Sequence, residues 1–333
     1  MATAPHAETD TELFTESHWS PEGHGRITAL CRGAFAGVPA LRSVSHYSNG
    51  IIDFVVRRRD CPPLSSMVTV GGEDIANEAL PGSRLLLCTQ DLGALTRPLG
   101  TGELMRVVLA NAHGGLWGGR VKPGEYLSAH TDTPGGTPAV DEAMNRLVSA
   151  IRTQVHHLPD ELPGGLTDTL EPLPEDKGRL RIDFGTAAAE HDGPSEMRLR
   201  ALWGTHVNTL DLQYAAYYRD WKLVCVGDVF ESPELGPRFL ETSVRSRRTS
   251  YRDLARSLRG HLARLTDALR LVVPPPADRL VLDVQEGAVY VIWLSPRDYV
   301  LGVTLDQRQV THAESRLRLL ADAVGGVMRT ARH

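Results

Sequence analysis

Two histidine-bearing patterns have the residue types of a metal site. His130 and Asp132 form a His-x-Asp triplet, which two-metal exopeptidases use because an imidazole and a bridging carboxylate can share cations. Here the triplet lies in a stretch rich in Gly, Pro and Thr before an expected helix, where Asp132 suits a turn. His156 and His157 follow that helix, and adjacent helical residues point about 100° apart. We therefore expect no metal site.

A cluster of arginines could instead bind an anion or a partner protein. It consists of Arg245, Arg247, Arg248 and Arg252, at the start of an expected helix that adds further arginines. Guanidinium groups gathered in this way can hold a phosphate or a carboxylate-bearing surface. The alternative is a solvated helix face, because arginine supplies most of the positive charge in a chain that has very few lysines.

No other pattern identifies a catalytic or cofactor-binding site. The glycine-rich stretch 114–119 follows an expected helix, whereas a phosphate-binding loop follows a strand and opens a helix. A helix C-terminal turn packed around Trp117 is therefore expected there. Gly71 and Gly72 lack the companion residues of a nucleotide motif and indicate a turn. No serine lies in a nucleophile elbow. Catalytic residues stay unassigned, and no cofactor is expected.

Composition restricts the class of protein further. The chain has 333 residues, of which 41% are hydrophobic and 23% charged, with a net charge of −5, so a globular protein is expected and wholesale nucleic-acid binding is unlikely. The longest apolar runs are strand-sized, and residues 1–20 lack signal-peptide features. The four cysteines are widely spaced, with no C-x-x-C pair. These features favour a soluble cytoplasmic protein with reduced thiols and no membrane contact.

Hydrophobic periodicity predicts the elements that must position any site. Helices are expected over residues 102–112, 138–157, 250–271 and 311–329, and the helix 250–271 carries a stripe of leucines. Strands are expected over residues 51–56, 67–70, 84–88, 180–184, 197–203, 207–217, 221–226, 280–284, 288–294 and 299–305. The last three strands form a meander with short turns, flanked by two of the helices.

This order of elements predicts an α+β fold with mixed, largely antiparallel sheets, packed helices and two lobes. Residues 1–24 are expected to be a disordered or loosely attached tail, followed by an N-terminal α/β lobe over 25–157. Residues 158–178 are rich in Pro, Gly and acids and form either a linker or a long surface loop. A C-terminal α+β lobe follows over 179–333. No internal repeat is visible in the sequence.

One stretch of the first half resembles a known family. Met67-Val68-Thr69-Val70-Gly71, the apolar run 81–87, the segment 104–113 and the Gly- and Trp-bearing turn 114–118 look like a suppressor-of-fused-like domain. The resemblance covers roughly residues 40–130 and departs from the family pattern where Ala112-His113 replaces its usual Pro-His. It implies a non-enzymatic domain that binds other proteins and, in bacteria, an immunity-type role.

Two classes of function follow. The absence of catalytic motifs favours a protein-binding or regulatory protein without catalysis, whose partner is another protein of unknown identity. The alternative is an enzyme of small-molecule metabolism whose site residues are dispersed along the chain. Anion or nucleic-acid binding through Arg245, Arg247, Arg248 and Arg252 is a third possibility, and the net charge of −5 argues against nucleic acid.

Overall fold

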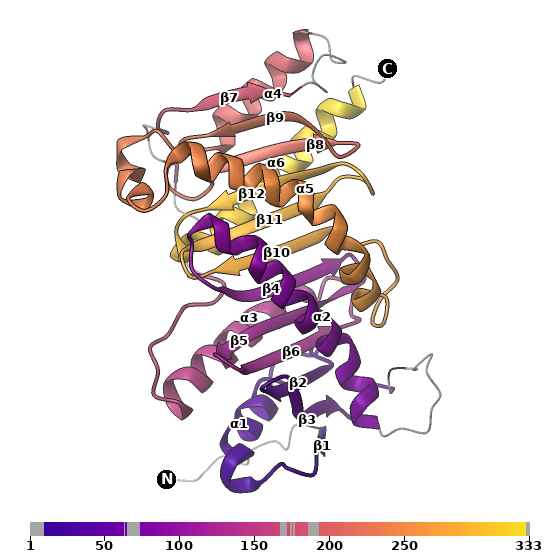
Figure 1. The fold of residues 1–333 in the computed structure, drawn as a ribbon. Coiled ribbons are helices and arrows are strands. Elements are labelled where there is room, and N and C mark those ends of the chain that lie inside the picture. The colour runs from indigo at the N-terminus through magenta and orange to yellow at the C-terminus, as the bar shows by residue number, and fades with distance from the viewer. Residues whose placement is uncertain are drawn as a thin grey trace. The chain divides into compact units, whose positions relative to one another are not determined.

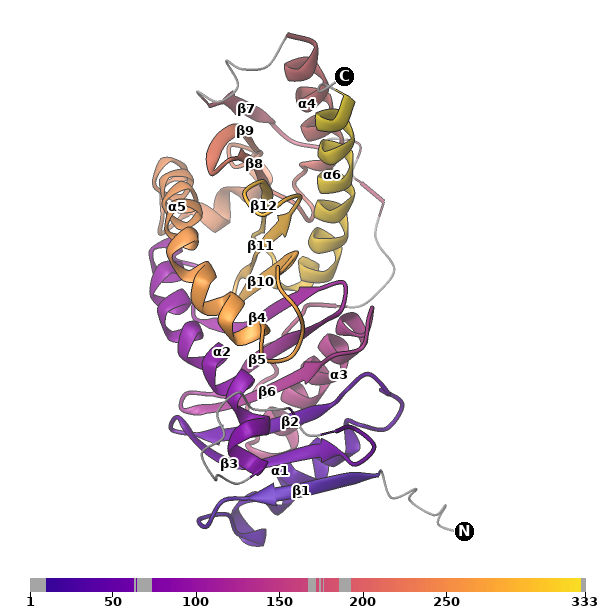
Figure 2. The same ribbon diagram turned by 90° about the vertical axis from the view of Figure 1, so that its right-hand side faces the viewer.

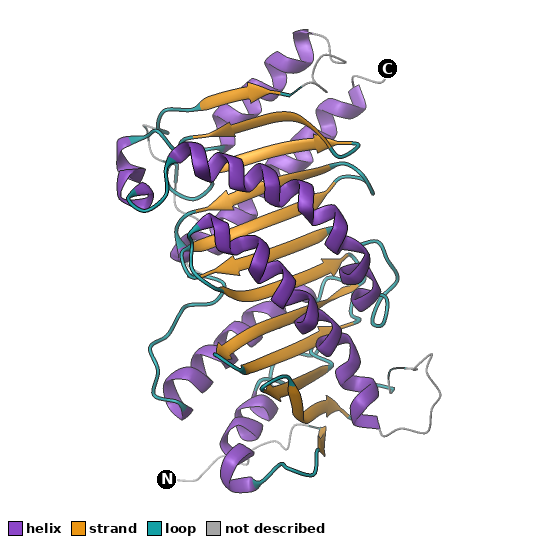
Figure 3. Ribbon diagram, in the orientation of Figure 1, coloured by secondary structure: helices purple, strands orange, loops and turns teal. Residues whose placement is uncertain are grey.

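The fold is α+β, as the order of elements predicts (Figure 3). The computed structural model describes residues 10–62, 64, 74–166, 172, 173, 175, 177–185 and 193–330. The helices are α1 (Pro21–Gly33), α2 (Asp74–Thr96), α3 (Thr137–Ala150), α4 (Gly193–His206), α5 (Val244–Leu269) and α6 (Val310–Thr330). A one-turn π-helix, η2 (Ile151–Val155), extends α3, and short 3-10 segments join other elements.

Antiparallel pairing connects neighbouring strands throughout the described sheets. The strands of the first half are β1 (Thr11–Thr15), β2 (Ser43–Ser48), β3 (Ile51–Arg58), β4 (Leu104–Asn111), β5 (Gly114–Lys122) and β6 (Glu125–Thr131). Those of the second half are β7 (Arg181–Phe184), β8 (Tyr214–Arg219), β9 (Lys222–Asp228), β10 (Arg279–Val284), β11 (Gly287–Trp293) and β12 (Tyr299–Thr304).

The chain divides into two compact units. The first contains the described residues up to Cys88 together with Val108–Glu161 and Arg264–Pro275. The second contains Thr89–Val107, Leu162–Ala263 and the described residues from Pro276 onward. Elements α2, β4 and α5 therefore have residues in both units.

In the first unit, helices cover both faces of the strands. The strand order is β1-β3-β2-β6-β5-β4. Helices α1 and α3 lie on one face and α2 on the other (Figures 1 and 2). The hydroxyl of Tyr47 in β2 donates to the Ala79 carbonyl of α2, which identifies the α2 face. Val55 of β3 packs with Ile75 and Ala79 on that same side.

The second unit has the same construction. Its strand order is β7-β9-β8-β12-β11-β10, which is the order of the first unit with each strand replaced by its later counterpart. Helices α4 and α6 pack against each other on one face, and α5 lies on the other (Figure 2). Tyr299 of β12 donates to the Ala255 carbonyl of α5, just as Tyr47 of β2 reaches α2.

Strand registers show that this likeness extends to single residues. Each unit has a hairpin closed by two residues of positive φ, Asn49-Gly50 in one and Asp220-Trp221 in the other. That is the backbone of a two-residue type I′ turn. In both hairpins a bulge follows the fourth residue of the first strand, after His46 in β2 and after Tyr217 in β8. The chain is therefore a tandem repeat, with a first repeat over 11–155 and a second over 181–330.

The repeat was not visible in the sequence because few side chains match. Over β5, β6 and their counterparts, the shared residues are Gly114/Gly287, Pro123/Pro296, Tyr126/Tyr299 and Thr131/Thr304. The glycine pair has a structural cause. A side chain at either position would meet the carbonyl oxygen of the matching threonine at 2.2 and 2.1 Å, respectively.

Several predicted elements are confirmed and others are wrong. The helices α3, α5 and α6 and the strands β3, β7, β9, β10, β11 and β12 lie where periodicity placed them. Residues 104–111, expected to be helical, form β4, and the expected strands at 84–88 and 197–203 lie inside α2 and α4. The expected tail 1–24 contains β1 and the start of α1, because Ser20 caps that helix by accepting from the Gly23 amide. The expected strand 67–70 lies outside the described residues.

Candidate functional site

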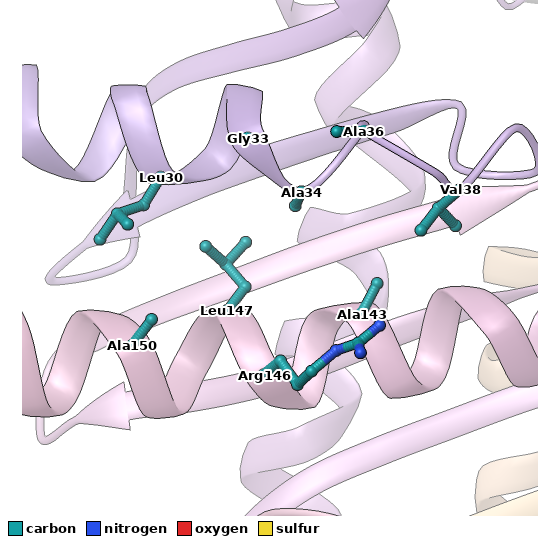
Figure 4. A pocket seen from close by; sticks show the side chains of 9 residues that line it. All are labelled: Leu30, Gly33, Ala34, Ala36, Val38, Ala143, Arg146, Leu147 and Ala150. Atoms are coloured by element: carbon teal, nitrogen blue, oxygen red, sulfur yellow. The ribbon is translucent and has the colours of Figure 1, made fainter. Parts of the chain in front are cut away.

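An open apolar groove runs between α1 and α3 on one face of the first unit (Figure 4). Its volume is about 330 Å³. Most of the lining side chains are small or aliphatic, and Arg146 is the charged one among them. The lining residues are Leu30, Gly33, Ala34, Ala36, Val38, Ala143, Arg146, Leu147 and Ala150.

The second repeat differs from the first at one position that lines the groove. Ala143 is the seventh residue of α3, and the seventh residue of α6 is Arg316. Arg316 Nε lies 2.7 Å from both carboxylate oxygens of Asp211, and both side chains are buried. Asp211 stands three residues before β8, where the first repeat has Ala40 three residues before β2. An alanine pair in the first repeat therefore replaces a buried ion pair in the second.

A buried histidine network lies on the same face of the sheet. His46 of β2 is 1% exposed, and its ring stacks on Phe54 at 5.1 Å. Its Nδ1 lies 2.7 Å from Asp53 Oδ2, and its Nε2 lies 3.1 Å from Glu125 Oε1. The network is defined as His46, Asp53 and Glu125 with the side chains that surround the two acids: His18, His24, Ser48, Lys122 and His156.

Hydrogen-bond geometry fixes the charge on the central histidine. A carboxylate only accepts, so His46 must donate from both ring nitrogens and is an imidazolium. The Lys122 ammonium donates to His156 Nδ1 at 3.0 Å, and His156 Nε2 lies 2.9 Å from Glu125. The Ser20 amide likewise donates to His24 Nδ1.

The pKa values follow from these partners. Burial would lower the pKa of His46, but hydrogen bonds and charges from Asp53 and Glu125 outweigh burial and raise it above the ordinary value. Burial would raise the pKa of Asp53, but hydrogen bonds from His46, Ser48 and His18 lower it to about 2. Glu125 behaves in the same way: hydrogen bonds from His46 and His156 overcome burial and lower its pKa to about 2.

The second repeat lacks the central residues of this network. Tyr217 stands at the position of His46, and Val224 at the bulged position of Asp53. The residue before Tyr299 is Asp298, which matches Glu125 before Tyr126 but has no imidazolium beside it. The ionised network is therefore a property of the first repeat alone.

The His-x-Asp triplet lies on the opposite, α2 face of the first unit and its members have separate partners. His130 Nδ1 lies 3.0 Å from Ser43 Oγ, whereas Asp132 pairs with Arg42. Burial, together with the Arg42 charge, lowers the pKa of His130 to about 3, so the ring is neutral. Its Nε2 lies 3.9 Å from Glu78 Oε2, and neither atom has a hydrogen-bond partner among the described residues.

The four candidate arginines differ in their partners and in their burial. Arg248 forms a two-pronged pair with Asp228, through Nε and Nη2 at 2.7 Å each, and also contacts Glu231. Arg247 is buried with its guanidinium over the Phe239 ring. Arg252 lies 3.9 Å from Asp183, and Arg245 is exposed. Two of these charges are therefore neutralised by carboxylates of the chain itself.

Other sequence candidates have structural roles. The expected turn 114–119 is instead most of strand β5, where a Cβ at Gly118 would lie 3.1 Å from Leu85 of α2. His156 belongs to the histidine network, and His157 adopts positive φ just beyond η2. Gly71, Gly72 and the serines 65 and 66 lie outside the described residues.

Sequence reasoning missed both the groove and the histidine network. His46, Asp53 and Glu125 come from three strands whose pairing the sequence did not reveal, and the groove is defined by side chains that are small. Among the described residues, no group of three or more His, Cys, Asp or Glu is arranged to hold a metal. In the same part of the chain, no helix has the length and apolarity required to cross a bilayer. No protein-family model and no curated protein matches this chain.

Proposed function

We propose that this chain is a cytoplasmic, non-catalytic binding protein whose first repeat holds an apolar segment of another protein in the α1–α3 groove. The observation that carries the proposal is the open groove itself, at a place where the second repeat packs a buried Arg–Asp pair. Apolar surface that is open on one side and lined by aliphatic side chains is typical of helix-in-groove recognition. The suppressor-of-fused-like resemblance implies the same class of function.

Charge around the groove favours a particular kind of segment. Arg146 lines the groove with a side chain that is 70% exposed, and its pair with Glu142 is a solvated i,i+4 contact of little strength. Arg26 lies four residues before Leu30, on the same face of α1, and adds positive charge at one end of the groove. A segment with two or three apolar side chains beside an acidic residue would match both features. The partner is then an acidic, amphipathic stretch of another protein.

The ionisable clusters do not favour an enzyme. His46 and His130 are almost fully buried, and their carboxylate and hydroxyl neighbours belong to the chain. A general acid or base must come within hydrogen-bond reach of a substrate atom. Neither histidine lines the groove.

Peptide selection with a plugged variant tests this function. A displayed library of random 12-residue peptides is selected on the full chain, and enriched peptides should be apolar with at least one acid. Ala143→Arg should reduce their affinity about tenfold or more, because the side chain fills the groove as Arg316 fills the second repeat. Ala139→Arg makes the same charge change at an exposed α3 position and should bind normally.

A milder plug, Ala143→Leu, covers the case in which the arginine variant unfolds. Its thermal unfolding should match that of the parent while peptide affinity falls. Enriched peptides that bind both plugged variants as tightly as the parent would place the binding surface elsewhere and contradict the proposal.

A further inference from the structure

We propose that the protonated His46 imidazole holds α1 against the sheet of the first repeat, so that the groove keeps its α1 wall at neutral pH and loses it as the pH rises. This inference rests on the proposed function, since it concerns regulation of the same groove. The histidine network lies between the sheet and α1, which forms one wall of that groove.

The network connects the sheet to α1 and to the segment before it through two histidines. Asp53 of β3 accepts from His18, in the segment that leads into α1, with Nε2–Oδ1 at 2.8 Å. His24, within α1, places its Nε2 3.8 Å from the same oxygen. Both contacts therefore depend on the Asp53 carboxylate, which His46 holds from the other side at 2.7 Å.

The network also reaches the other wall of the groove. Glu125 accepts from His156, directly after η2, and η2 continues α3. Arg26 of α1 donates to the Gln154 carbonyl of η2 at 2.8 Å, which joins the two walls at one end. Between these polar ends lie the groove-lining residues of α1 and α3. Both walls are thus anchored to acids that share a single imidazolium.

Loss of the His46 proton would remove one of the two hydrogen bonds that this ring donates to Asp53 and Glu125. A neutral imidazole donates one hydrogen bond, so either Asp53 or Glu125 would face a nitrogen lone pair. The titratable groups that face the central trio are His18, His24, His156 and Lys122, and the Cys31 thiol of α1 lies within the field of Glu125. That carboxylate would keep only its outer partners, His18 and Ser48 for Asp53 or His156 and Lys122 for Glu125, and a buried charge that loses a partner is destabilised. Opening α1 to water is the local way to relieve it.

The second repeat supplies an internal control. Helix α4 occupies the position of α1, and Tyr217 and Val224 occupy the positions of His46 and Asp53. Trp203 of α4 is fully buried and donates to the Ala215 carbonyl at 2.9 Å, a contact without a titrating group. Helix α4 should therefore not respond to pH in the same range.

Amide hydrogen exchange on the full chain tests the proposal without any partner. Protection is measured by mass spectrometry at pH 6 and pH 9 for peptides from α1 and α4, corrected for the pH dependence of intrinsic exchange. We expect α1 protection to fall about tenfold or more between these values while α4 protection changes little. His46→Gln should show low α1 protection at both pH values, and His18→Gln should keep the pH dependence.

Each result separates this proposal from the proposed function. Unchanged α1 protection in the parent chain, or pH dependence that survives in His46→Gln, would overturn the role of His46. Selected peptides that bind equally at pH 6 and pH 9 despite a loosened α1 would overturn the link to the groove. If α1 protection depends on pH but no peptide binds at either pH, the role of His46 is supported and the proposed peptide binding is contradicted.

Discussion

Several equivalent strand positions hold polar or ionisable side chains in the first repeat and aromatic or aliphatic ones in the second. His46 and Ser43 correspond to Tyr217 and Tyr214, and His130 corresponds to Val303. A buried ion pair adds little stability compared with apolar side chains of similar volume. Stability alone therefore does not account for the polar core of the first repeat, which specificity or regulation explains better.

The stability of the first repeat should depend on pH in both directions. The pKa of His46 is raised, so its contribution is complete below about pH 6.5, the unfolded value, and is lost as the pH rises through the folded pKa. The pKa values of Asp53 and Glu125 are lowered to about 2, so their contribution is complete above about pH 4.5 and is lost as the pH falls toward 2. Urea unfolding across pH 3–9 should give a plateau near pH 5–6.

A variant identifies the source of the alkaline decline. His46→Gln should flatten that limb of the profile while the acidic limb remains. If the stability of the variant still falls at alkaline pH as in the parent, a group other than His46 causes that fall.

Thiol reactivity should differ sharply among the cysteines. Cys61 is partly exposed, whereas Cys31 and Cys225 are buried. Burial raises the pKa of Cys225 to about 12 and raises that of Cys31 further, so both remain unreactive thiols at neutral pH. A chromogenic disulfide reagent should modify Cys61 first in the native chain. Rapid modification of Cys225 at native pH would contradict the burial of β9.

At the scale of elements, periodicity identified those helices that have one apolar and one polar face. The leucine stripe of α5 is an example: Leu254, Leu258, Leu265 and Leu269 are all buried. Leu262, from the same stripe, is only partly buried because it lies at the edge of the covered face. The spacing therefore predicted the helix and its buried face but not how far that face extends.

The elements whose type was predicted wrongly are those that lack one apolar and one polar face. Strand β4 has almost every residue buried, and such a strand reads as a continuous apolar run that periodicity cannot separate from a helix. The adjacent residues Val107 and Val108 within β4 did indicate a strand, because β-branched residues favour strands. The apolar run 84–88 was expected to be a strand, yet it lies inside α2, a helix that also contains Pro81. Tertiary packing decided both cases.

Substitutions in α5 test the observed face. Leu258→Ala removes a side chain that is 1% exposed and should destabilise the chain by about 2–5 kcal/mol. Leu262→Ala should cost less, because the side chain is only partly buried. Arg259→Ala should cost at most about 1 kcal/mol, since its contact is a cation–π pair with Trp221 at a solvent-exposed position. Denaturant unfolding of the three variants gives the order, and a larger effect at Leu262 would contradict the assignment.

At the scale of the whole molecule, the tandem repeat is the feature that sequence reasoning could not reach. Equivalent positions share registers, bulges and turn geometry, all of which are properties of the backbone. The turn Asn49-Gly50 has a strong hairpin signature, whereas Asp220-Trp221 forces a tryptophan to φ 64° and has none. Because the two repeats form the same turns, bulges and registers with different residues, the sequence shows no visible repeat.

The repeat leads to a last prediction about the Arg316–Asp211 pair. Asp211→Ala leaves a buried guanidinium without its carboxylate and should destabilise the chain by about 3–5 kcal/mol. Arg316→Ala in the same chain recreates the Ala143/Ala40 arrangement of the first repeat. The double variant should therefore be more stable than Asp211→Ala alone by at least about 1 kcal/mol, because no unpaired charge remains.

Urea unfolding of the two single variants and the double variant gives the coupling energy between these side chains. The double variant should also gain an open space beside α6 where the parent holds the ion pair, which a crystal structure would show. Strictly additive effects, or a space that collapses on α4, would show that the first repeat keeps its groove open by something other than the loss of this pair. In that case the cause would lie in the small residues of α1 itself, Gly33 and Ala34, which line the groove where α4 ends in His206.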